Sequence, residues 1–60
     1  MNDEHEGVYR AFDGQTVTIE VSTELNGLYV VTWYRPSGIA VGHLSTIEVV
    51  ALKRRMSKED

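Results

Sequence analysis

The chain contains no cysteine, one proline and two histidines among its 60 residues. Without cysteine, disulfides and thiolate metal sites are excluded. His5 and His43 are too few for a histidine-rich zinc site unless carboxylates or a second chain contribute. No apolar run approaches the ~20 residues of a membrane-spanning helix, and the amino end lacks the basic start and apolar run of a signal peptide. We therefore expect a cytoplasmic protein with no metal ion and no other cofactor.

The chain is also short. Sixty residues form a single domain (1–60), and a domain of this size buries only about 60% of the surface that its unfolded chain exposes. Small scaffolds commonly add a disulfide, a metal or a partner subunit, and here only the partner remains. We therefore expect a homo-oligomer, in its simplest form a dimer. The polar ends of the chain, residues 1–6 and 56–60, are expected to be frayed.

Basic residues are fewer than acidic ones, six against nine, so the net charge is −3. This charge does not favour a general nucleic-acid binder. The basic residues nonetheless gather near the carboxyl end, and Tyr34 precedes Arg35 at a turn, a pair on which single-stranded nucleic acids stack. A nucleic-acid-binding regulator is therefore the alternative function, and its predicted contacts are Arg35, Lys53, Arg54, Arg55 and Lys58.

The chain is rich in strand-forming residues, above all in Leu28–Arg35, which reads Leu-Tyr-Val-Val-Thr-Trp-Tyr-Arg. Both faces of this strand carry apolar or aromatic side chains, which is typical of a central strand. Gly7–Phe12, Gln15–Thr23 and Ile39–Leu44 are the further predicted strands, and Asp13-Gly14 predicts a tight turn between the first two. These four strands predict an antiparallel meander.

The second turn decides which side chains share a face. Asn26-Gly27 fits a two-residue loop or a three-residue loop that begins at Leu25, and a slip of one residue inverts every side chain. We select the three-residue loop, which pairs Val21 with Val31, because it gathers the apolar residues. The resulting core face consists of Val17, Ile19, Val21, Tyr29, Val31 and Trp33, with Trp33 largely buried.

The third turn, Arg35 to Gly38, has proline second and glycine fourth and pairs Tyr34 with Ile39. Ala40, Gly42 and Leu44 then join the core face. The opposite face collects an apolar patch that something must cover. An isologous dimer buries such a patch twice, with Tyr34 as its anchor. We therefore predict a small non-enzymatic regulatory or adaptor module that acts by protein contact through Val30, Thr32, Tyr34, Ile39, Val41 and His43.

Residues 45–58 have two interpretations. As a helix, the segment has a capping box, Ser45 with Glu48, but its apolar residues fall on two opposed stripes. As a strand, Ile47–Lys53 pairs back to the first strand, which suits its β-branched residues. We favour the strand. The predicted fold is therefore all-β, a meander of four to five strands curled into a small SH3-like barrel; the alternative is a meander with a carboxyl-terminal α-helix.

The run Val49-Val50-Ala51-Leu52-Lys53-Arg54 resembles the last strand of the plasmid-borne type II dihydrofolate reductases, which are SH3-like barrels that assemble as tetramers. The resemblance covers six of the 60 residues. The Val-Gln-Ile-Tyr run that this family uses at its active site is absent, and the nearest stretch reads Val41-Gly42-His43-Leu44. The resemblance therefore implies a barrel fold and carries no activity.

Catalysis has little support in the sequence. His43 lies close to Ser45 along the chain, and Glu20 is on a neighbouring predicted strand. A histidine with one neighbouring hydroxyl does not make a catalytic constellation. We expect His43 to lie at the rim with its ring bonded to the backbone, and the protein not to be an enzyme.

Overall fold

The computed structural model describes residues 3–59, which form one five-stranded antiparallel sheet and one short helix. This arrangement confirms the prediction of a small all-β meander. The elements are β1 (Gly7–Ala11), β2 (Thr16–Val21), β3 (Leu28–Arg35), β4 (Gly38–Ser45), α1 (Thr46–Lys53) and β5 (Met56–Glu59).

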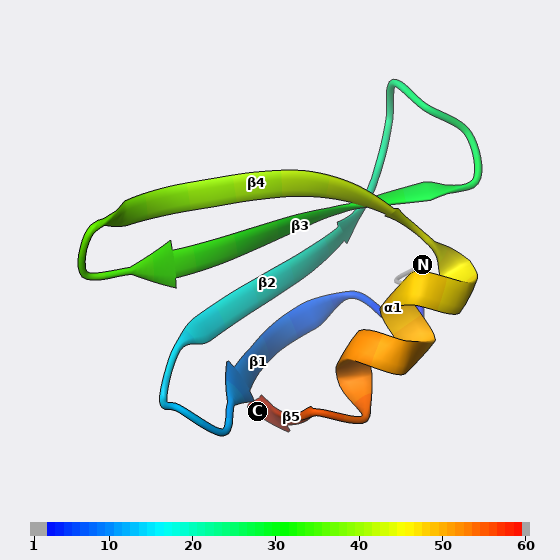
Figure 1. The fold of residues 1–60 in the computed structure, drawn as a ribbon. Coiled ribbons are helices and arrows are strands. Elements are labelled where there is room, and N and C mark those ends of the chain that lie inside the picture. The colour runs from blue at the N-terminus through cyan, green and yellow to red at the C-terminus, as the bar shows by residue number, and fades with distance from the viewer. Residues whose placement is uncertain (1–2, 60) are drawn as a thin grey trace.

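The strand order is β4-β3-β2-β1-β5, so β4 and β5 are the two edges of the sheet (Figure 1). Within residues 3–59 no pairing joins these edges, and the sheet stays open rather than closing into the predicted barrel. Helix α1 connects the edges and lies against one face of the curved sheet, while the β3–β4 hairpin extends past it.

The β3–β4 register is the predicted one, with Tyr34 opposite Ile39 and Trp33 opposite Ala40. The predicted β2–β3 register is wrong by two residues, since Val21 pairs with Tyr29. The connection is longer than the three-residue loop because the Ser22 hydroxyl accepts the N–H of Leu25 and holds the chain in a wider turn. A shift of two residues preserves the side-chain alternation, so the predicted core face is retained except at Val21, which ends β2 and is 42% exposed.

Two predictions for the carboxyl-terminal segment, the strand over Ile47–Lys53 and the frayed end, are wrong. Thr46–Lys53 is a helix, not the favoured strand, so the resemblance to a last barrel strand does not hold there. The Ser45 hydroxyl accepts the Glu48 N–H at 3.4 Å and the Glu48 carboxylate accepts the Ser45 N–H at 3.0 Å, which completes the capping box. The strand that pairs with β1 is formed instead by Met56–Glu59, within a segment predicted to be frayed; Asp60 lies outside the described residues.

The amino-terminal segment is also ordered where fraying was expected, apart from residues 1–2, which lie outside the described part. The N–H of His5 and the hydroxyl of Tyr29 both donate to the Asp3 carboxylate. The Tyr9 hydroxyl donates to the His5 carbonyl at 2.8 Å. Buried tyrosines need partners for their hydroxyl groups, and this segment supplies them.

The core lies between the concave face of the sheet and α1. Val49 is the one fully buried helix residue among those described, and it packs with strand residues from β1, β2 and β3. Trp33, which was predicted to be largely buried, is partly buried at the rim of this cluster, where its ring lies against Gly42. The buried cluster is Tyr9, Val17, Ile19, Tyr29, Val31 and Val49, with Trp33, Leu44, Leu52 and Met56 packed against it.

Candidate protein-contact surface

The six residues predicted for protein contact all lie on the face of the sheet opposite the core. The β3–β4 register places them in three directly opposed pairs, Val30 with His43, Thr32 with Val41 and Tyr34 with Ile39. Side chains at alternate strand positions share a face, so these pairs form one continuous stripe. We call this set (Val30, Thr32, Tyr34, Ile39, Val41 and His43) the outer stripe.

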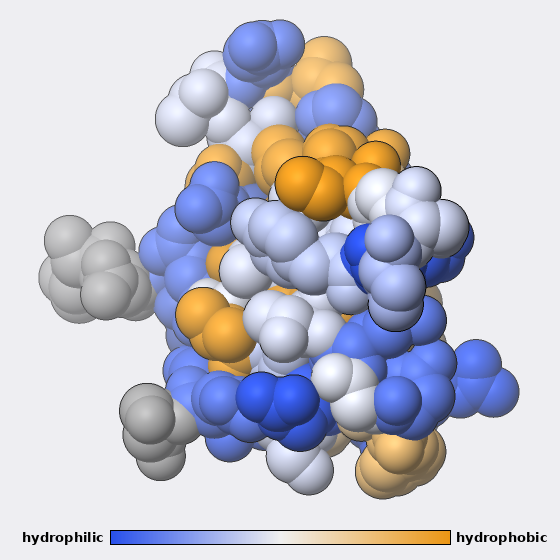
Figure 2. Space-filling view, turned by 90° about the vertical axis from the view of Figure 1, so that its left-hand side faces the viewer, coloured by the Kyte–Doolittle hydropathy of each residue, from blue (hydrophilic) through white to orange (hydrophobic). Residues whose placement is uncertain are grey.

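The outer stripe is mostly apolar; its β4 residues and Tyr34 are exposed, whereas Val30 and Thr32 are partly buried. Ile39 is 66% exposed, Val41 is 61% exposed and Tyr34 is 43% exposed. Other exposed apolar side chains include Phe12 at 84% on a turn and Ile47 at 82% on the helix. Val8 at 44% and Val21 at 42% lie in β1 and β2, outside the stripe. Figure 2 shows the strongest apolar colour at the level that β4 occupies in Figure 1, above a mostly hydrophilic lower half.

The two edge strands differ in charge and length. β4 reads Gly-Ile-Ala-Val-Gly-His-Leu-Ser over Gly38–Ser45 and carries no Asp, Glu, Lys or Arg. β5 has half that length and carries both Lys58 and Glu59. Short, charged edges resist pairing with another chain, whereas long uncharged apolar edges invite it. β4 is therefore the unprotected edge of the sheet.

The residues predicted for nucleic-acid contact do not form one surface. Arg35 ends β3 and lines an open hollow together with Asp13 and Pro36. The other four predicted contacts belong to the end of α1 and to the segment after it, which lie apart from the end of β3 in Figure 1. Lys53 is half-buried, and its ammonium lies 2.9 Å from Nδ1 of His5. The others, Arg54, Arg55 and Lys58, are exposed around the junction of α1 and β5.

His43 and the groups considered beside it do not converge. The Ser45 hydroxyl is occupied by the cap of α1. Glu20 and His43 both lie opposite Val30, from β2 and β4 respectively, so their backbones are two strand spacings apart, about 9–10 Å. His43 is an exposed member of the outer stripe with no nucleophile positioned against it in the described structure.

A polar cluster that the sequence analysis missed joins the amino terminus to the end of α1. The His5 ring meets the Tyr29 ring edge-on, with centroids 5.5 Å apart, and the Lys53 ammonium lies 6.0 Å from the centre of the Tyr9 ring. The hydrogen bond from the His5 N–H, followed by the bond from Tyr29, lowers the pKa of Asp3. Burial raises the pKa values of Tyr9 and Tyr29. Tyr9 and Tyr29 lie on strands, and a buried tyrosine needs a hydrogen-bond partner for its hydroxyl group. This need is the feature of the sequence from which the cluster could have been predicted.

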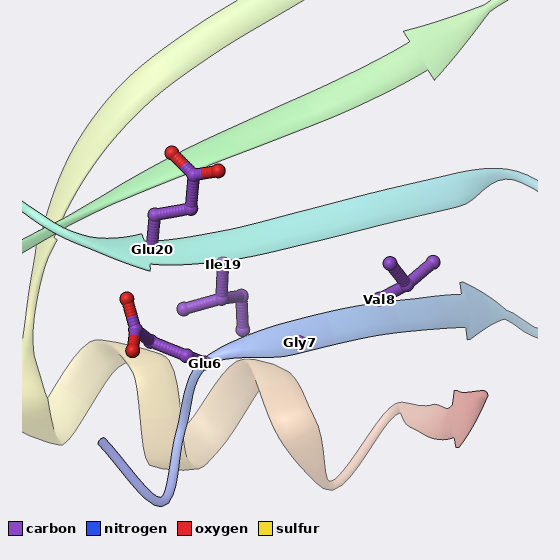
Figure 3. Close-up of a pocket in the computed structure, with 5 residues that line it drawn as sticks. All are labelled: Glu6, Gly7, Val8, Ile19 and Glu20. Carbon is purple, nitrogen blue, oxygen red and sulfur yellow. The ribbon is translucent and has the colours of Figure 1, made fainter. Parts of the chain in front are cut away.

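An open hollow of about 300 Å³ lies where β1 begins, lined by Glu6, Gly7, Val8, Ile19 and Glu20. Figure 3 shows the two glutamates at one end of it and Val8 at the other. A pair of carboxylates can serve acid–base chemistry, but both Glu6 oxygens already accept main-chain N–H groups, from Asp3 and Val21. Glu6 therefore holds the amino-terminal turn against β2.

Neither a cluster of metal ligands nor a membrane-spanning helix is found in the described residues. No cluster of three or more metal-ligating side chains occurs in residues 3–59. No helix in this range is long and apolar enough to cross a membrane. Comparison of the chain with protein-family models, curated proteins and solved structures gives no match.

Proposed function

We propose that this protein is a small non-enzymatic regulatory or adaptor module that acts by protein contact and associates with itself through β3 and β4. The observation that carries the proposal is the outer stripe, an uncharged apolar surface that spans two adjacent strands and ends at an open edge. Contiguous exposed apolar surface on a small protein marks interaction sites, whereas single exposed apolar residues need no explanation.

The size of the domain supports the same proposal. Six described side chains make up the buried apolar cluster, and one of them comes from the helix. A core this small leaves a marginal stability, and contact of the outer stripe and its open edge with a second protein adds stabilisation that the isolated chain cannot supply. A cytoplasmic setting is part of the proposal, since a chain without cysteine needs no oxidising compartment to fold.

The experiment is sedimentation equilibrium of the wild type and of Val41→Asp across a wide concentration range. We expect a wild-type mass of two chains and a Val41→Asp mass of one chain, because the change places an unpaired charge in the contact. Val41 is 61% exposed, so the variant keeps its fold as a monomer.

Ile47→Asp is the matched control. Ile47 is 82% exposed in the first turn of α1, where an acidic residue suits the helix dipole. This variant should remain dimeric. A wild-type mass of one chain at every concentration would overturn the proposed self-association, and loss of the dimer in Ile47→Asp alone would move the contact to the helix.

A further inference from the structure

The hydrogen-bond pattern of the sheet fixes where the backbone groups of β4 point. The N–H of Ser22 donates to the carbonyl of Leu28 at 3.1 Å, so this opposed couple is hydrogen-bonded. Bonded couples alternate with unbonded ones along an antiparallel ladder. On β3, the even-numbered residues therefore bond to β2 and the odd-numbered residues, Tyr29 to Arg35, bond to β4.

The partners of those odd-numbered β3 residues on β4 are Gly38, Ala40, Gly42 and Leu44. The residues between them, Ile39, Val41 and His43, direct their N–H and carbonyl groups away from the sheet. Because β4 is an edge, no strand of the described chain meets these groups. The same three residues thus present both an open main-chain ladder and exposed side chains of the outer stripe.

The ladder has a defined end. Ser45 would continue the series, but the Glu48 carboxylate accepts its N–H in the helix cap. At the other end the series meets the Pro36-Ser37 turn. The open ladder therefore consists of Ile39, Val41 and His43, with Val41 at its centre.

We infer that a second copy of this chain pairs with β4 edge to edge, antiparallel about a two-fold axis at Val41, and joins the two sheets into one. This inference rests on the proposed self-association and specifies its geometry. Centring at Val41 places Ile39 opposite His43 of the second copy and Val41 opposite Val41. It is the one register that engages all three open residues of both copies, with roughly six hydrogen bonds, two for each opposed couple.

The side chains and charges of β4 suit this occupant. On the outer face, Val41 meets its own copy, a β-branched pair that stabilises cross-strand contact. On the core face, Ala40 lies opposite Gly42 of the second copy, and the single methyl group of this couple does not obstruct approach. A strand without charged residues meets no like-charge repulsion from an identical strand, although the chain as a whole carries a net charge of −3. A two-fold contact of this kind is self-limiting, since it uses the open edge of each copy once.

Single-cysteine cross-linking tests the register, because the chain has no cysteine of its own. In the paired dimer, Val41→Cys places its thiol opposite its own copy, within disulfide reach. Ile39→Cys is the matched control: it is equally exposed, but its copy lies about 13 Å away along the strand, beyond the ~7 Å that a disulfide spans between Cα atoms. Under mild oxidation we expect Val41→Cys to form the covalent dimer at least about ten-fold faster than Ile39→Cys.

A proline variant tests the main-chain contribution. The N–H of Val41 points away from β3, so Val41→Pro leaves the β3–β4 ladder intact, as proline does at strand edges, and removes a donor from the dimer. We expect Val41→Pro to melt cooperatively as a monomer and Val41→Thr, which keeps the N–H and the branched shape, to remain dimeric.

The outcomes separate this inference from the proposed function. A wild-type dimer in which Val41→Cys and Ile39→Cys cross-link at equal rates, or in which Val41→Pro stays dimeric, overturns edge pairing and leaves self-association standing. A wild type that is monomeric throughout overturns both. If Val41→Pro does not fold, the ratio of the two cross-linking rates decides the geometry by itself.

Discussion

Two glycines within strands have different reasons to be glycine. Gly7 has φ of 150°, a value that side chains rarely adopt, and an added Cβ would lie 2.8 Å from Cε of Lys58. Gly42 has no positive φ, and an added Cβ would meet the Trp33 ring at 3.4 Å, an ordinary contact distance. The backbone therefore constrains Gly7, while Gly42 is constrained only by its neighbour.

The same substitution should act in opposite directions at these two sites. Gly7→Ala should lower the free energy of unfolding by roughly 1–3 kcal/mol through backbone strain. Gly42→Ala should leave it unchanged or raise it by up to about 1 kcal/mol, because alanine restricts the unfolded chain. Urea denaturation of both variants is the measurement. Equal destabilisation of the two would show that the contact with Trp33 is tighter than the structure indicates.

Among the elements, α1 owes its stability more to its amino-terminal cap than to the spacing of its apolar residues. Its apolar residues do not form a single stripe: Val49 and Leu52 face the core, whereas Ile47 is almost fully exposed. The main-chain N–H of Ser45, which donates to Glu48, lowers the pKa of that carboxyl. An eight-residue helix is too short to persist by propensity alone, so the cap and the burial of Val49 stabilise it.

Ser45→Ala should therefore destabilise the protein by about 1 kcal/mol, the usual cost of losing a hydroxyl cap. The same change at Ser57, an exposed β5 residue, is the control and should have a much smaller effect. Thermal melting of both variants checks this. If Ser45→Ala has the melting temperature of the wild type, burial of Val49 is sufficient to stabilise α1 and the cap is dispensable.

At the scale of the whole molecule, carboxylates fasten both ends of the chain to the sheet. Hydrogen bonds from the His5 N–H and the Tyr29 hydroxyl lower the pKa of Asp3, and the fields of His5 and Lys53 add to this. The Arg10 guanidinium, which bonds to Glu59 across β1 and β5, lowers the pKa of that carboxyl. Both terminal attachments are therefore stronger when the carboxylate is ionised.

The sign of the pH dependence follows from these directions. A carboxyl whose pKa is depressed by folding contributes stability above its unfolded pKa, and that stability is lost as the pH falls through the folded pKa. We expect the melting temperature to be steady near neutral pH and to fall below about pH 4. Asp3→Asn should lower the neutral-pH melting temperature and flatten the acid decline, whereas Glu24→Gln, an exposed loop carboxyl, should do neither. An acid decline of unchanged steepness in Asp3→Asn would exclude this attachment as its source.

The residue pattern alone predicts the first four strands, the alternation of their side chains and the membership of the outer stripe. Period-two patterns are local, and Pro36 with Gly38 fixed the β3–β4 register within a few residues of chain. The β2–β3 register could not be derived in the same way, because the Ser22 hydroxyl sets the loop length. The side chains of β2 still point to the predicted faces, because an odd shift in register would expose the apolar residues, whereas an even shift keeps them on the same face.

The structure near both ends of the described chain and the open edge of β4 depend on contacts between segments that are distant in sequence. Met56–Glu59 contains one apolar residue, so its own sequence does not predict a strand. It becomes one because it pairs with the free edge of β1 and because Glu59 forms an ion pair with Arg10. Residues 3–6 are ordered because two tyrosine hydroxyls elsewhere in the chain need acceptors. Thr46–Lys53 is helical because the sheet leaves a place for Val49, which outweighs the strand preference of its β-branched residues. With α1 occupying that place, β4 and β5 do not meet, and the unprotected edge of β4 is the consequence.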